Sequence, residues 1–138
     1  MFKTELDVRA RPPNLWLVLS PLVWDDRLTT EHGKGFGRVE FPAAFITDLG
    51  STPQLLHFIK YCDPTCVGRR SAVGHDYLYA NGKWPDGRTV TRAEADEFLR
   101  VGMISEGHAP ALARSWWFGV RSGGWLPWNR YRRAEVDR

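Results

Sequence analysis

The spacing of apolar residues changes along the chain, from short runs in the first third to helical periodicity afterwards. Residues 15–24 form the first apolar run, and Pro21 within it excludes a helix and favours strands. The glycine-rich stretch 32–37 is typical of a hairpin tip, and short strands are expected at 39–46. The pattern predicts a small antiparallel sheet within residues 1–47.

After this part, apolar residues recur at helical spacing, and local signals mark where helices begin and end. A capping box at 91–94 begins one helix, and Asn81-Gly82 ends another. Pro53 and Pro110 suit first helical positions. The sequence therefore predicts an α+β fold in a single domain, with a small N-terminal antiparallel sheet followed by three to four helices.

Composition sets the C-terminal end apart from this domain. We expect one domain at residues 1–124, with a β part at 1–47 and a helical part at 51–124, followed by a Trp/Arg-rich tail at 125–138. From residue 111 onward six arginines face two acids, a sum of +4, so the rest of the chain carries −1 of the total +3. The basic character is a property of the C-terminal part.

The overall composition, with 43% hydrophobic and 25% charged residues, is ordinary for a soluble globular protein. No apolar run is long enough to span a bilayer. The first residues lack the apolar core of a signal peptide. We therefore expect no transmembrane segment, and synthesis in the cytoplasm.

The segment 72–79 places a histidine, an acid and two tyrosines in an otherwise apolar helical run. His75 and Tyr79 are four residues apart and therefore share one face of the helix. On the next helix, Asp96 is the acid that lies at the border of the apolar stripe. Because buried polar groups need partners, we expect these three side chains to meet, with Asp96 orienting His75 as a general base.

Asp48 and Asp76 complete the candidate cluster. Their carboxylates suit a hard divalent cation such as calcium, which would polarise a carbonyl or phosphoryl group of a substrate. A second arrangement would make His75, Asp76 and Asp96 ligands of a transition metal such as zinc, with His57 as the fourth ligand. The sequence leaves both arrangements open.

Two further interpretations of these residues also stay open. Asp48 could bond only backbone amides of its own turn, and His75 with Asp96 could simply join two helices. Cys62 and Cys66 could form a zinc site with nearby histidines, although their spacing matches no standard zinc module.

Two local resemblances bear on the cluster. The run 75–79, HDYLY, is similar to the H-D-x-C-Y helix of secreted phospholipases A2, in which an aspartate on a second helix supports the histidine. This resemblance implies that role for Asp96, although the sequence has neither their disulfide framework nor a glycine-rich calcium loop immediately before the helix. The H…HD…D order resembles metal-dependent phosphohydrolases, which are all-helical and usually longer.

A broader resemblance covers about residues 40–105. Three motifs in order, at 47–53, 72–79 and 92–96, resemble a family of short tailed-phage and prophage proteins catalogued as a domain of unknown function. The resemblance implies a product of virion and tail genes, made in the host cytoplasm and then carried in the virion. It implies no particular reaction.

These observations lead to the expectation of a phage virion- or tail-associated protein with a metal-assisted, hydrolase-like site that acts on host envelope material. His75, Tyr79 and Asp96 are the expected catalytic residues. Asp48 and Asp76 are the expected ligands of a divalent cation, either calcium or zinc.

The alternative is a non-catalytic tail or baseplate protein that docks on other virion proteins through its C-terminal end. Trp and Arg are favoured in interface hot spots, and the expected docking residues are Trp125, Trp128, Arg130, Arg132 and Arg133. The same charge would suit an anionic membrane surface. Nucleic acid is not an expected partner, because the arginines have no regular spacing.

Overall fold

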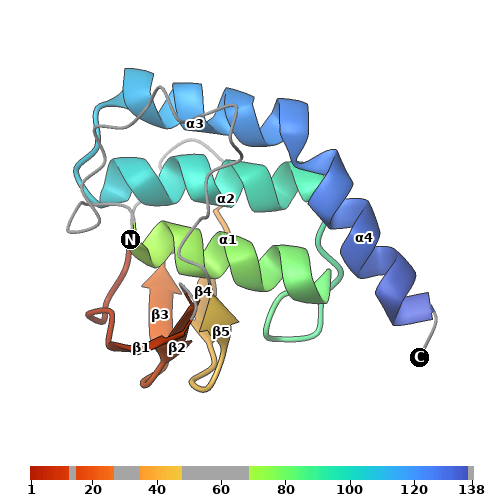
Figure 1. Ribbon diagram of the computed structural model, residues 1–138. Helices are drawn as coiled ribbons and strands as arrows, with labels where there is room; N and C mark the ends of the chain where they lie inside the picture. Colours follow the sequence, from red (N-terminus) through yellow and green to blue (C-terminus); the bar gives the residue numbers. More distant parts are fainter. Residues whose placement is uncertain (13–14, 27–34, 48–68, 137–138) are drawn as a thin grey trace.

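The computed structural model describes residues 1–12, 15–26, 35–47 and 69–136 (Figure 1). The expected short helix at 54–61 lies outside these residues, as do Asp48, His57, Cys62 and Cys66. In the described part an N-terminal pair of antiparallel sheets precedes four helices, so the predicted α+β class is confirmed.

The five strands form two separate antiparallel sheets. The three-stranded sheet has the order β1-β2-β5 and the two-stranded sheet pairs β3 with β4; their bounds are β1 Val8–Arg11, β2 Leu15–Val18, β3 Leu22–Asp25, β4 Arg38–Phe41 and β5 Ile46–Thr47. The apolar run 15–24 thus supplies two strands to different sheets, separated at Pro21. Proline cannot donate to a strand ladder, which explains why pairing stops there.

The four helices are α1 Arg69–Asn81, α2 Arg92–Ser105, α3 Pro110–Gly123 and α4 Trp125–Val136. Helices α1, α2 and α3 lie side by side with α2 in the middle, and α4 turns away across one end of this layer (Figure 1). The segment predicted as a C-terminal tail is therefore a helix for most of its length. No helix among the described residues is long and apolar enough to cross a membrane.

The start of α2 follows its sequence signal. The Thr91 hydroxyl accepts from the backbone N–H of Glu94, and the Glu94 carboxylate accepts from the backbone N–H of Thr91 at 2.8 Å. The predicted capping box is confirmed. The predicted apolar stripe of α2 is also buried: Ala95, Phe98, Leu99, Gly102 and Met103.

An aromatic cluster centred on Phe98 joins the sheets to the helices. Five aromatic rings lie with their centroids between 5.2 and 6.1 Å from that of Phe98: Phe2, Trp24, Phe36, Phe41 and Trp84. Gly74 on α1 makes room for them, since a Cβ there would lie 2.5 Å from Cε1 of Phe98. The cluster therefore fixes the distance between α1 and α2.

A buried carboxylate holds the N-terminal end of α1. The Glu106 side chain is only 4% exposed, and it accepts hydrogen bonds from the backbone N–H groups of Arg70 and Ser71 at 3.2 and 3.0 Å. It also accepts from the Ser71 hydroxyl at 2.7 Å and from Arg70 Nε at 3.1 Å. An acid from the end of α2 thus satisfies helix N–H groups that have no partner within α1.

Replacing Glu106 by glutamine is expected to lower the free energy of unfolding by about 1.5 kcal/mol, because several hydrogen bonds to a charged acceptor are weakened or lost. Urea unfolding followed by circular dichroism measures this. The matched control is Glu97→Gln, since Glu97 is 41% exposed and pairs with Arg100 on the surface of α2. Equal losses in both variants would contradict the capping role.

Candidate active site

The side chains of His75, Tyr79 and Asp96 meet between α1 and α2, as their spacing predicted. The Tyr79 hydroxyl donates to Oδ1 of Asp96 at 2.5 Å, and Nε2 of His75 lies 3.2 Å from the same oxygen. The His75 and Tyr79 rings lie with their centroids 4.2 Å apart. Asp96 is fully buried, whereas the His75 side chain keeps 11% of its surface exposed.

Two arginines contact the other carboxylate oxygen of Asp96, Oδ2. Arg121 on α3 donates from Nη1 to Oδ2 at 2.9 Å, and Nη1 of Arg92 lies 3.5 Å from it. Arg92 also donates to the backbone carbonyls of Val120 and Arg121, at the end of α3. One carboxylate therefore joins three helices, with the aromatic donors on one oxygen and the guanidinium groups on the other.

Sequence reasoning did not identify either arginine. Arg92 precedes Asp96 by four residues on the same helix, and this spacing is the signal that could have found it. Arg121 is 25 residues from Asp96 and comes from another helix, so no local pattern indicates the contact.

The contacts determine the charge of the cluster. Burial acts to raise the pKa of Asp96, but hydrogen bonds from His75, Tyr79 and Arg121 outweigh it and hold the pKa below its ordinary value. Burial acts to lower the pKa of His75, but the carboxylates of Asp76 and Asp96 on either side of the ring outweigh it and raise the pKa. Burial is the main reason that the pKa of Tyr79 is raised, so its hydroxyl stays protonated and can donate.

The second ring nitrogen of His75 faces Asp76. Nδ1 lies 3.9 Å from Oδ1 of Asp76, which is beyond hydrogen-bond distance. The Asp76 carboxylate accepts a hydrogen bond from the Thr47 hydroxyl of β5, and its side chain is 21% exposed. Nε2 is thus committed to Asp96, and Nδ1 points to the more exposed side, where it can take a proton.

The structure describes only one of the two predicted cation ligands, Asp76. Asp48 lies outside the described residues, although Thr47 before it contacts Asp76. Among the described residues, no three His, Cys, Asp or Glu side chains gather in a way that could hold a metal ion. His75, Asp76 and Asp96 therefore do not form a three-ligand set, because Asp96 lies on the Nε2 side of the ring and Asp76 on the Nδ1 side.

The five predicted docking residues divide into two groups on α4. Trp128 packs edge-on against Tyr79, with centroids 5.2 Å apart, and Arg132 donates to the backbone carbonyls of Tyr79 and Ala80 at 3.0 and 2.9 Å. These two attach α4 to the end of the site helix. The other three are exposed to solvent: Trp125, Arg130 and Arg133.

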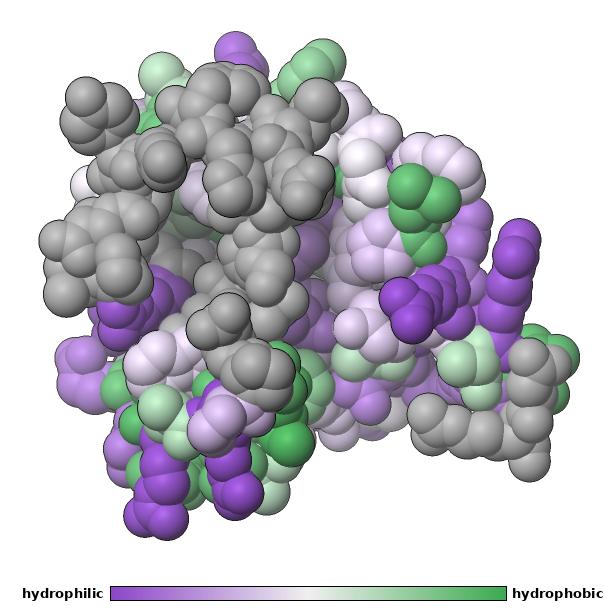
Figure 2. Space-filling view, in the orientation of Figure 1, coloured by the Kyte–Doolittle hydropathy of each residue, from purple (hydrophilic) through white to green (hydrophobic). Residues whose placement is uncertain are grey.

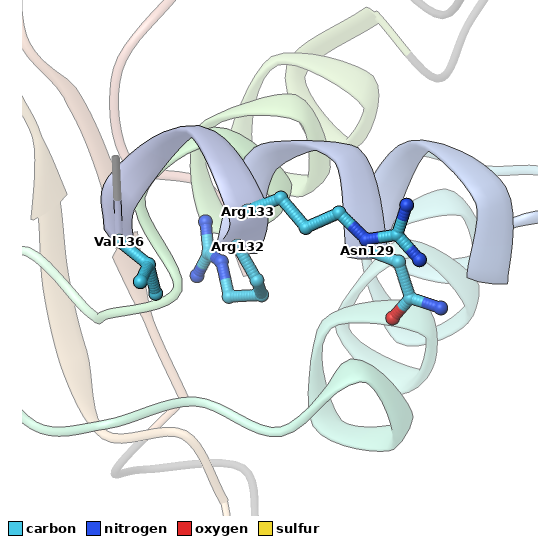
Figure 3. Close-up of a pocket in the computed structure, with 4 residues that line it drawn as sticks. All are labelled: Asn129, Arg132, Arg133 and Val136. Atoms are coloured by element: carbon cyan, nitrogen blue, oxygen red, sulfur yellow. The ribbon is translucent and has the colours of Figure 1, made fainter. Parts of the chain in front are cut away.

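A shallow pocket of about 430 Å³ runs along α4, lined by Asn129, Arg132, Arg133 and Val136. Figure 3 shows the guanidinium group of Arg133 beside the amide of Asn129, and that of Arg132 directed away from them. None of these four is among the residues that contact Asp96. The pocket is therefore a separate feature of the C-terminal helix.

Comparison with known proteins places the chain in a family. No curated protein and no solved structure matches it. A family model with the description "Protein of unknown function (DUF1353)" matches residues 16–120, which include His75, Asp76, Tyr79 and Asp96 and end immediately before Arg121. Because this match covers well over half of the sequence, the chain belongs to the DUF1353 family of proteins of unknown function.

Proposed function

We propose that this protein is a phage virion- or tail-associated hydrolase that acts on host envelope material. The observation that carries the proposal is the contact of His75 and Tyr79 with one oxygen of the buried Asp96. The similarity of the run 75–79 to the phospholipase A2 helix supports this role for the pair. The phage setting rests on the resemblance of three sequence motifs to tailed-phage proteins.

His75 is the general base in this proposal. Nδ1 takes a proton from a water molecule, whose oxygen attacks the carbonyl or phosphoryl centre of the substrate, and the bond to the leaving group then breaks. The proton passes from Nδ1 to the leaving group, which restores the neutral imidazole. Asp96 fixes the ring through Nε2 and stabilises the imidazolium that forms in between.

The two arginines keep the Asp96 carboxylate ionised, which this role requires. A carboxylate that is fully buried would tend to bind a proton, and a protonated Asp96 would stabilise an imidazolium poorly. Arg121 and Arg92 on Oδ2 favour the ionised form. They also leave Oδ1 free for His75 and Tyr79.

Asp76 would hold a divalent cation, with Asp48 as the second carboxylate predicted from the sequence. Carboxylate oxygens suit calcium, and a bound cation would polarise the substrate oxygen that gains charge. Asp76 lies on the same side of His75 as Nδ1, so a substrate oxygen held there would stand close to the general base.

The test measures product release from host envelope extracts and the metal content of protein purified without chelator. His75→Gln is expected to lower the rate by a factor of about 10² to 10⁴ and to leave the fold intact. Asp76→Asn is expected to lose the metal. The matched controls are His108→Gln and the exposed Asp86→Asn, which should change neither quantity.

A second candidate is a non-catalytic tail or baseplate protein. The observation that favours this candidate is that the fully buried carboxylate of Asp96 joins α1, α2 and α3, as a purely structural residue would. In that case the wild-type protein would contain no metal and release no product, and His75→Gln would unfold it. Exposed Trp125, Arg130 and Arg133 would then be the docking residues.

A further inference from the structure

Exposed apolar side chains concentrate on α3 and α4. Among the described residues nine large apolar side chains are exposed, and five of them belong to the stretch 118–136: Phe118, Trp125, Leu126, Tyr131 and Val136. Phe118 is 67% exposed and Leu126 is 60% exposed. Burying such side chains would be favourable, so their exposure on one short stretch indicates a contact surface.

Three of these side chains share one side of the helical stretch. Trp125 and Leu126 follow Phe118 by seven and eight residues, the spacing of one helix face. Gly124 between α3 and α4 keeps right-handed helical angles, φ −69° and ψ −8°, so the two helices continue each other with a bend. The opposite side of α3 packs inward through Val120 towards α2, and on α4 Trp128, three residues after Trp125, packs inward towards α1.

Arginines flank this apolar surface. Arg114, Arg130 and Arg133 are exposed on the same two helices. From residue 111 onward the sequence carries six arginines and two acids. Figure 2 shows strongly hydrophilic and strongly hydrophobic side chains next to each other over the α4 end of the molecule. The surface is therefore both apolar and positively charged.

We infer that this surface, defined as Phe118, Trp125, Leu126, Arg130 and Arg133, docks on an anionic lipid bilayer. Apolar side chains that lie between arginines suit the interface of a bilayer. There Trp and Leu side chains insert among the acyl chains, and Arg side chains bind the lipid phosphates. Nucleic acid would offer the exposed aliphatic side chain of Leu126 no favourable contact. A protein interface would have a compact centre depleted of charge, whereas here exposed arginines lie among the apolar side chains.

The pocket along α4 fits the same occupant. Asn129 and Arg133, whose side chains lie beside each other, supply amide and guanidinium N–H groups to its wall, and guanidinium groups bind phosphate oxygens well (Figure 3). A lipid phosphate held there would lie beside the apolar side chains that enter the bilayer. This surface would attach the proposed hydrolase to the envelope, and in that respect it rests on the proposed function. Lipid binding there does not involve His75 or Asp96.

The experiment is co-sedimentation of the full chain with vesicles of phosphatidylglycerol and phosphatidylcholine in equal parts, compared with phosphatidylcholine alone. Binding is expected to the anionic vesicles only and to weaken at high salt. The double variant Arg130→Gln/Arg133→Gln should bind about 25-fold more weakly, at about fivefold for each arginine. Leu126→Ser and Phe118→Ser should each weaken binding about tenfold.

The matched controls lie on the sheet side of the molecule. Ile46 is 53% exposed and Arg11 is exposed, so Ile46→Ser and Arg11→Gln should leave vesicle binding unchanged. Equal binding to neutral vesicles, no binding to anionic ones, or equal losses in the controls would overturn the inference and favour a protein partner. Because no turnover is measured, a chain that binds vesicles but hydrolyses nothing would overturn only the proposed activity.

Discussion

Replacing Asp96 by alanine is expected to lower the free energy of unfolding by about 3 kcal/mol. The change leaves Arg121, Arg92 and the Tyr79 hydroxyl without their shared acceptor in a site where Asp96 itself has no exposed surface. Removing one partner of a buried ion pair costs about 3–5 kcal/mol, and the lower end applies because the two arginines are 32% and 22% exposed. Urea unfolding at neutral pH measures the loss.

The matched control for Asp96 is its neighbour on the same helix. Glu97 pairs with Arg100 on the surface, so Glu97→Ala should lower the free energy of unfolding by less than about 1 kcal/mol.

The pH dependence of the unfolding free energy gives a second check on Asp96. Because the pKa of folded Asp96 is lowered, its contribution is complete above the unfolded-state pKa of about 3.9 and is lost as the pH falls through the folded value. In Asp96→Asn the decrease of the unfolding free energy at acidic pH should be smaller than in wild type. The same decrease in both proteins would contradict the ion pair.

Replacing Phe98 by alanine is expected to cost about 3–5 kcal/mol. Phe98 has no exposed surface, and its ring meets five other aromatic rings from both the sheet and the helical parts of the domain. The substitution would therefore leave a cavity and remove several edge-to-face contacts. Thermal and urea unfolding of the variant measure the loss.

Phe118→Ala is the matched control, because the same side chain is removed from the outer face of α3, where it is 67% exposed. Its stability should stay within about 0.5 kcal/mol of wild type. If both variants were equally stable, the cluster around Phe98 would not be the centre of the core. Phe118→Ala also separates stability from membrane docking, since it should weaken only the latter.

The C-terminal helix connects the proposed docking surface to the candidate active site. Trp128 packs on the ring of Tyr79, and Arg132 binds the carbonyl of the same residue while lying 5.0 Å from the Trp128 ring. The outer side of α4 carries Leu126, Arg130 and Arg133, which are spaced by four and three residues and are all exposed. A surface that attaches the protein to an envelope would therefore be carried by the helix that packs against α1, the helix of His75 and Tyr79.

The sequence by itself determined the features that depend on spacing within one element. The capping box of α2, its buried stripe and the shared face of His75 and Tyr79 all follow from helical periodicity, and the structure has them. Asp96 could be assigned to the cluster because it is the acid of α2 at the border of the apolar stripe. These features need no knowledge of how the helices pack.

Tertiary structure alone decided which distant groups complete the site. Arg121 reaches Asp96 from α3, Thr47 reaches Asp76 from β5, and Arg132 closes the end of α1 from the segment predicted as a tail. The physical reason is the same in each case. A buried charge or a free helix end requires a partner, but the partner's position in the sequence is set by how the whole chain packs, and no local spacing encodes it.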